Sequence, residues 1–103
     1  MKEIIVRDIL KSNVAISKDD GDIVFNQIKT EIENKNSILI DFKNIDLINT
    51  AFLNNAIGKI YFIPIEKRMD TTVRIVNFPL EVMELLEEVI NTAKEKASIT
   101  EDA

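Results

Sequence analysis

The sequence predicts a small α/β domain built on a mainly parallel sheet. Segments typical of strands alternate with segments that have helical periodicity, in the order strand, helix, strand, helix, strand, helix. The chain has 103 residues, which suits one domain. Hydrophobic residues make up 46% and charged residues 30%, a mixture typical of a globular protein and not of a disordered one. Alternating strands and helices imply right-handed crossovers between parallel strands.

Two strand segments are expected before the first helix. The β-branched run within residues 2–6 indicates a strand. The residues that follow, up to Ile16, are ambiguous, and one interpretation places a second short strand at 14–16. The first helix begins after Ser17, because its hydroxyl can cap the first turn and two aspartates there complement the helix dipole. Apolar residues at every fourth position extend this helix to about Asn34, namely Val24, Ile28 and Ile32.

The middle of the chain predicts a buried strand, a loop and a second helix. Residues 37–42 are nearly all apolar apart from Asp41, which suits a strand in a sheet that is covered on both faces. The loop spans residues 43–49. The second helix ends or kinks at Pro64, because proline lacks an N–H and its ring clashes with the preceding turn. Its apolar face consists of Phe52, Leu53, Ala56, Ile57 and Ile60.

The last third predicts one more strand and one more helix. Residues 71–76 have high β propensity. The helix starts near Pro79, since proline is tolerated in a first turn. Its buried stripe comprises Val82, Leu85, Leu86, Val89 and Ala93. We expect one domain over residues 1–97 and a flexible C-terminal tail at 98–103. The pattern leaves open whether the helices cover one face of the sheet or both.

Composition excludes several kinds of function. The chain has no cysteine and no histidine, which removes disulfides, thiolate metal sites and the commonest general base. We therefore expect no metal centre and no cofactor. The net charge of −5 argues against nucleic acid as a partner, because that binding depends on cationic side chains. The first residues do not resemble a signal peptide, and no apolar run is long enough for a membrane span, so a cytoplasmic location is expected.

The stretch from Asp41 to Leu53 is the most informative for function. A strand ends near a carboxylate, a short loop follows, and a hydroxyl-bearing residue stands at the start of an amphipathic helix. In open α/β sheets, ligands and partners bind beyond the carboxyl ends of the strands, and a helix start offers free N–H groups. This predicts a partner-binding corner around residues 46–55, formed by Asp46, Asn49, Thr50, Ala51, Asn54 and Asn55.

The segment from Asp41 to Lys59, which contains Ile48-Asn49-Thr50-Ala51-Phe52-Leu53, resembles the STAS-like family. That family is related to the STAS domains of bacterial anti-sigma-factor antagonists. The resemblance is best over residues 37–59 and looser over 73–90. It implies a small sandwich in which a mainly parallel or mixed sheet of about four strands packs with three helices. It also implies a regulatory, signalling interaction module whose partner is a histidine-kinase-like ATPase.

In such antagonists, phosphorylation of a serine at the helix start controls release of the kinase. By position, Ala51 stands where that serine stands, and alanine has no hydroxyl. Thr50 lies one residue earlier and is the candidate phosphorylation site under a shifted register. The simpler interpretation is that Asn49 or Thr50 caps the helix. Asp41 either contributes to binding or fixes the turn by accepting hydrogen bonds from loop amides.

The leading interpretation of function is a protein-interaction module that docks its partner through this corner. The alternative is a small-ligand or anion sensor that uses the helix start at Asn49-Thr50. An enzyme is not expected, because no acid–base pair, phosphate-binding loop or activated nucleophile is visible. The apolar run Tyr61-Phe62-Ile63 either closes the core or forms a homodimer patch, and the core is favoured.

Overall fold

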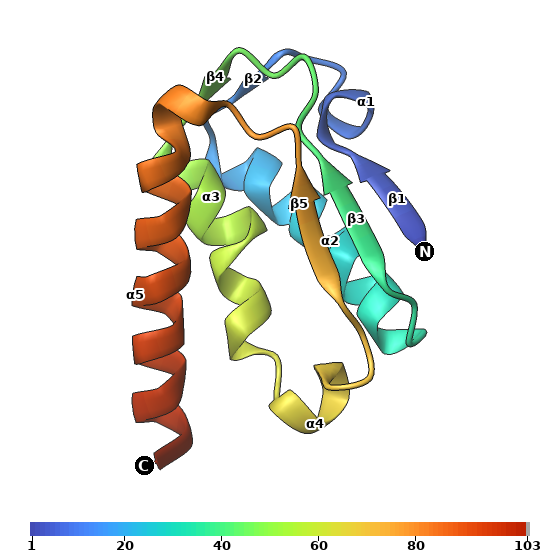
Figure 1. Ribbon diagram of the computed structural model, residues 1–103, viewed down its shortest axis with the longest axis vertical. Helices are drawn as coiled ribbons and strands as arrows, with labels where there is room; N and C mark the ends of the chain where they lie inside the picture. Colours follow the sequence, from blue (N-terminus) through green and yellow to red (C-terminus); the bar gives the residue numbers. More distant parts are fainter. Residues whose placement is uncertain (103) are drawn as a thin grey trace.

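Two small parallel sheets organise the chain (Figure 1). The structure, a computed structural model, describes the backbone of residues 1–102 and the side chains of residues 1–98. The larger sheet has the strand order β1 (Lys2–Ile5), β3 (Ile38–Asp41) and β5 (Val73–Val76). The smaller sheet pairs β2 (Val14–Ala15) with β4 (Leu47–Ile48). Each of these strand pairs is parallel, so the α/β class and the parallel sheet predicted from the sequence are confirmed.

Helices fill the connections between the strands. Within the described residues they are α1 (Val6–Leu10), α2 (Lys18–Glu33), α3 (Thr50–Ala56), η1 (Gly58–Phe62), α4 (Ile65–Arg68), η2 (Leu80–Val82) and α5 (Met83–Asp102), where η denotes a 3₁₀ helix. Helices α2 and α3 lie behind the larger sheet in Figure 1, and α5 runs along the outer side of α3. The α2–α3 contact is the most extensive one between elements, and it sets the position of the loop before α3.

The helices cover only one face of the larger sheet. Successive side chains of a strand point to opposite faces. The cross-strand row Ile4, Ile40 and Ile75 faces the helices and belongs to or packs against the core. The next row points away from them, and its members are Glu3, Leu39 and Arg74. Glu3 and Arg74 are exposed, and Leu39 is half-buried. The helices therefore lie on one face, which settles the alternative that the sequence left open, and none of residues 37–42 is exposed.

The core lies between this sheet face and the helices. The predicted stripe of α2 is buried, and so is the predicted apolar face of the second helix. The rings of Phe42 and Phe78 meet edge to face, with centroids 5.0 Å apart, and close the core beyond the carboxyl ends of β3 and β5. Tyr61 and Ile63 pack against the core as expected, whereas Phe62 is 48% exposed.

Several short elements differ from the prediction. Val6 begins α1 where the sequence predicted strand, and residues 47 and 48 form β4 inside the predicted loop. The second helix changes to a 3₁₀ helix after Ala56, and Pro64 precedes α4. The described residues therefore hold five strands and five α-helices, more than the four strands and three helices implied by the resemblance. A strand pair as short as β2–β4 depends on a contact between distant segments, which local pattern does not contain.

The C-terminal end of α5 extends past the predicted domain boundary at residue 97. The helix backbone includes residues 98–102, where the sequence predicted a flexible tail. Residue 103 and the side chains of 99–103 lie outside the described part, so flexibility of the tail stays a prediction. In the part of the chain that the structure describes, no helix has the length and apolarity that crossing a membrane requires.

Candidate functional site

Residues 13–17 and 46–55 form one corner of the molecule, which we call the docking corner. Its backbone is fixed by the β2–β4 pair and by contacts around Asn13. The Asn13 carbonyl accepts a hydrogen bond from the Asp46 N–H at 2.8 Å, and the Asn13 side-chain amide donates to the Asp46 carboxylate at 2.6 Å. This double contact holds the predicted loop against a segment that lies far away in the sequence. The loop before α3 is therefore held in place by hydrogen bonds to Asn13.

Asn49 joins the two halves of the docking corner. Its side-chain oxygen accepts a hydrogen bond from the Phe52 N–H at 3.0 Å, so Asn49 is the N-cap of α3. Its side-chain nitrogen donates to the Ile16 carbonyl at 2.9 Å. A single side chain thus satisfies an N–H of the helix start and a carbonyl of the chain after β2. Capping, the simpler of the two sequence interpretations, describes Asn49 and not Thr50.

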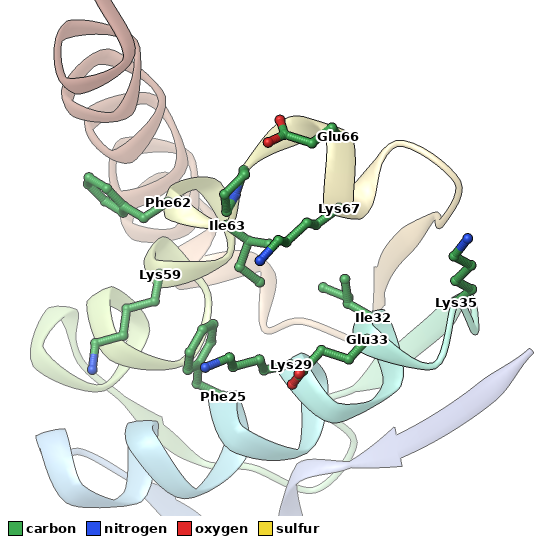
Figure 2. A pocket seen from close by; sticks show the side chains of 11 residues that line it. Phe25, Lys29, Ile32, Glu33, Lys35, Lys59, Phe62, Ile63, Glu66 and Lys67 are labelled. Carbon is green, nitrogen blue, oxygen red and sulfur yellow. The ribbon is translucent and has the colours of Figure 1, made fainter. Parts of the chain in front are cut away.

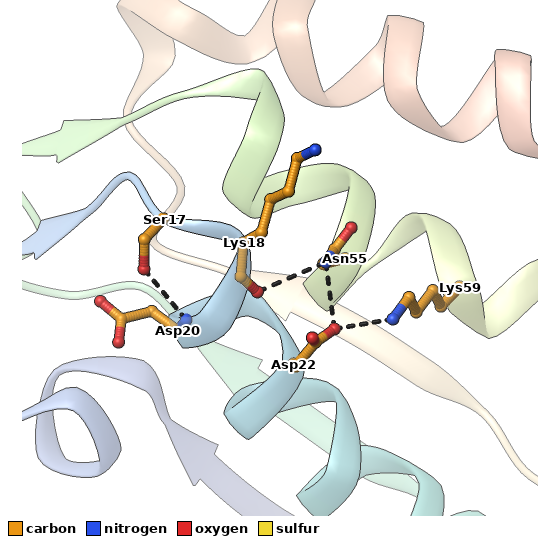
Figure 3. Close-up of polar contacts among 6 residues, drawn as sticks. All are labelled: Ser17, Lys18, Asp20, Asp22, Asn55 and Lys59. Carbon is orange, nitrogen blue, oxygen red and sulfur yellow. Dashed lines mark hydrogen bonds and ion pairs between the residues drawn. The ribbon is translucent and has the colours of Figure 1, made fainter.

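The start of α2 supports α3 from below (Figure 3). Gly21 is buried, and a Cβ at this position would come within 2.7 Å of the Phe52 carbonyl oxygen. The Asn55 side-chain amide donates to Asp22 at 3.1 Å, and the Lys59 ammonium lies 2.7 Å from the same carboxylate oxygen. The hydrogen bond from Lys59 lowers the pKa of the Asp22 carboxyl group below its ordinary value. The sequence analysis placed Asn55 among the partner-binding residues, and in the structure its amide contacts α2.

The other predicted residues of the corner face solvent. Asp46, Thr50 and Asn54 are exposed, and Ala51 is half-buried. Thr50 and Asn54 also line a shallow groove of about 380 Å³ between α3 and α5. Among the described residues, the side chains of Thr50 and Asn54 form no hydrogen bond. The structure thus brings Asp46, Asn49, Thr50 and Ala51 together at one edge, with Asn54 one turn further along α3.

Comparison with known protein families shows which family the chain belongs to. A family model described as a STAS-like domain of unknown function (DUF4325) matches residues 20–77, which is more than half of the chain. The chain belongs to this STAS-like family. The match confirms the resemblance inferred from residues 41–59, and it covers α2 from residue 20 onward and all of α3. No curated protein and no solved structure matches the chain.

The sequence analysis missed two apolar residues of the STAS-like domain. Ile16 and Leu47 are 47% and 59% exposed, although both have large hydrophobic side chains. Leu47 belongs to β4, and Ile16 directly follows β2, so neighbouring segments of the docking corner carry them. The sequence holds no local signal for their exposure, because Ala15, Ile16, Leu47 and Ile48 are all apolar. Which of them are exposed follows only from the β2–β4 pairing.

Asp41 of the STAS-like domain is 6% exposed and accepts two hydrogen bonds at the carboxyl end of the sheet. The Lys43 N–H and the Asn77 side-chain amide each donate to its Oδ1 atom at 2.9 Å. Burial by itself raises the pKa of Asp41, but these two hydrogen bonds and the positive charge of Lys43 together outweigh it, and the pKa lies below its ordinary value. These contacts correspond to the turn-fixing role, one of the two roles considered for Asp41.

The exposed polar groups of the docking corner include the Asp46 carboxylate, the Thr50 hydroxyl and the Asn54 amide. The described part of the chain has no group of three or more acidic side chains arranged to hold a metal ion. The lone tyrosine, Tyr61, lies against the core, and burial raises its pKa, which keeps the phenol protonated. The corner instead offers a fixed backbone, two exposed apolar side chains and a few polar groups. Such a surface suits recognition of another molecule.

Proposed function

We propose that this STAS-like domain is a non-enzymatic regulatory module that docks a protein partner through the docking corner. The observation that carries the proposal is the exposure of Ile16 and Leu47 on a backbone held by Asn13, Asp46 and Asn49. Exposed apolar side chains at a fixed position mark interaction sites. A rigid surface also binds with a smaller loss of conformational entropy than a mobile loop. Polar groups at the rim then determine register and specificity.

The resemblance to anti-sigma-factor antagonists supports a histidine-kinase-like ATPase as the partner, in the cytoplasm. Thr50 and Asn54 are exposed beside the apolar pair and have side-chain atoms free for hydrogen bonds to a partner. Asn49 and Asn55 contribute differently, because their polar atoms already bind within the chain. In this proposal they hold the corner in shape, and Ile16, Leu47, Thr50 and Asn54 make the contact.

The anion sensor, which was the alternative function, receives no support from the helix start. The Phe52 N–H is already taken by Asn49, and α3 has only seven residues. A short helix has a weak dipole, and a capped N-terminus has fewer free donors. We therefore retain partner docking as the single proposal for this corner.

A binding experiment tests the proposal. The protein is titrated into the histidine-kinase-like ATPases of its own source organism, and calorimetry gives the Kd for wild type and Leu47→Glu. We expect L47E to raise the Kd at least about tenfold, because a buried charge replaces a central apolar contact. The matched control is Met69→Glu, since Met69 is also an exposed apolar residue but follows α4 at the other end of the molecule (Figure 1).

Two outcomes of this experiment would contradict the proposal. Circular dichroism must show the same helix content for both variants, so that a loss of fold is recognised. Equal Kd values for wild type and L47E rule out the docking corner as the contact surface. If neither wild type nor M69E binds any of these ATPases detectably, this class of partner is ruled out.

A further inference from the structure

A second surface of the molecule has the features of a ligand site. A groove of about 700 Å³ lies between the second half of α2 and the segment formed by η1 and α4. Figure 2 shows its side chains. This volume falls within the range of small-molecule sites. The groove lies at the end of the molecule away from β2 and β4, so it is separate from the docking corner (Figure 1).

The floor of the groove is apolar. Phe25 and Ile32 contribute from α2, while Phe62, Ile63 and Pro64 contribute from the opposite wall. Phe62 is about half exposed even though it neighbours the core residues Tyr61 and Ile63. Ile32 is already buried, but covering the exposed parts of Phe25, Phe62 and Ile63 with an apolar body would be favourable, at roughly 25 cal/mol per Å² of area removed from water.

The rim of the groove is basic on an otherwise acidic chain. It holds four lysines and two glutamates, whereas the whole chain has a net charge of −5. Lys59 is engaged by Asp22, but Lys29, Lys35 and Lys67 form no ion pair among the described residues. In Figure 2, Lys67 reaches from α4 toward the α2 wall, on which Lys29 lies. Lysines that have no ion-pair partner and lie beside an apolar surface favour a ligand that has an anionic group on an apolar body.

We propose that this groove binds a small organic anion that has an aromatic or branched apolar body and one carboxylate or equally acidic group. Phe25 and Phe62 bind the apolar body, and Lys29 and Lys67 bind the acidic group from opposite walls. The proposal does not depend on partner docking, because the groove and the docking corner share no residue. The compact volume favours a small molecule over an extended acidic peptide, which needs a longer groove.

A titration followed by ¹⁵N NMR tests this inference with two probes of equal shape. The probes are 2-naphthoate and its neutral isostere 2-naphthamide. We expect saturable shifts of amides in residues 25–35 and 59–67, with a Kd for naphthoate about fivefold below that for naphthamide, because only naphthoate has a charge-assisted contact. Raising NaCl to 0.5 M should remove most of this difference, since exposed charges are screened.

Variants separate the charged contact from the apolar one. The double variant Lys29→Glu with Lys67→Glu should raise the naphthoate Kd at least about tenfold and leave naphthamide nearly unchanged. Phe62→Ala should weaken both probes. Lys18→Glu is the matched control, because Lys18 is an exposed lysine of α2 that lies outside the groove. It should leave both Kd values as in wild type.

Three results overturn the proposal. The first is equal affinity for the two probes, which leaves only apolar adsorption. The second is a set of shifts located at residues 13–17 or 46–55, or no saturation at millimolar probe. The third comes from a peptide of alternating glutamate and leucine added in parallel. If the peptide shifts the groove amides and naphthoate does not, the groove takes a protein segment instead of a small anion.

Discussion

The Asp41 carboxylate accepts a hydrogen bond from the Asn77 side-chain amide at 2.9 Å, and this contact ties the carboxyl end of β3 to the residue after β5. The same oxygen accepts from the Lys43 N–H, so one buried atom fixes both turns that leave the sheet. Asn77 has a φ of 57°, a left-handed conformation that asparagine tolerates better than most residues. The two turns that follow β3 and β5 therefore depend on Asp41 as an acceptor.

Replacement of Asp41 should destabilise the fold in proportion to the acceptors lost. Asp41→Ala leaves two donors without a partner, and we expect a loss of about 2–3 kcal/mol in the free energy of unfolding. Asp41→Asn keeps an acceptor oxygen and should cost only about 1 kcal/mol. Urea denaturation measures both values. Asn77→Gly is the control, because glycine keeps the left-handed φ and removes only one donor. A loss below about 0.5 kcal/mol for D41A contradicts this role.

The pH dependence of stability should contain a contribution from Asp41. Its pKa in the folded chain is lower than the ordinary value of 3.8, so the stabilisation is present above that value and is lost as pH falls through the folded pKa. The stability difference between wild type and D41N should be constant from about pH 5 to pH 7 and shrink below about pH 4. Asp22 shifts in the same direction, so Asp22→Asn serves as a parallel control. A difference that stays constant down to pH 2 contradicts the assignment.

Gly21 and Gly58 form a matched pair for testing the packing of α3. A Cβ at Gly21 would lie 2.7 Å from the Phe52 carbonyl oxygen and 2.8 Å from Asn55 Cβ, so α2 and α3 must separate. We expect Gly21→Ala to cost about 1–3 kcal/mol despite the better helix propensity of alanine. Gly58→Ala meets only ordinary contacts, the shortest being 3.5 Å to Val89, and should be neutral or slightly stabilising. Thermal unfolding compares them, and equal Tm values for the two variants argue against close α2–α3 packing.

Asn49 should be more important than an ordinary helix cap. Asn49→Ala removes the cap of α3 and the donor to the Ile16 carbonyl, for an expected loss of about 2 kcal/mol. Asn49→Asp retains the cap but loses the donor, so its stability should lie between those of wild type and N49A. Hydrogen exchange of the amides in β2 and β4 should speed up in both variants. If N49D is as stable as wild type, the contact with Ile16 contributes little.

Thr50 should be phosphorylated if the partner is a kinase of the proposed type. Thr50 is exposed at the first position of α3, and its hydroxyl has no hydrogen bond within the described residues. A phosphate adds about −1.5 to −2 charges next to the apolar pair of the docking corner and should weaken docking. Mass spectrometry after incubation with the ATPase and ATP detects the modification, and Thr50→Val is the control. No phosphothreonine after incubation with active enzyme eliminates this switch.

Residues with a local signal were predicted well. Ser17 caps α2 through the Asp20 N–H, and the stripe of Val24, Ile28 and Ile32 is fully buried, because capping and periodicity depend on neighbours within a few residues. The loop containing Asp46 and Asn49 was recognised from its place between a strand and a helix. What was missed there is non-local: Leu47 pairs with Val14, and Asn55 contacts Asp22.

The sequence by itself determined the α/β class, the three main strands, the Ser17 cap of α2 and the family, because each depends on short-range patterns of side chains. Only the tertiary structure decided that the helices cover one face of the sheet, that Gly21 allows α3 to approach α2, and that Ile16 and Leu47 are exposed together. The basic groove between α2 and α4 was also visible only in the tertiary structure. These features arise where segments distant in the chain meet, and local pattern has no information about which partner each segment finds.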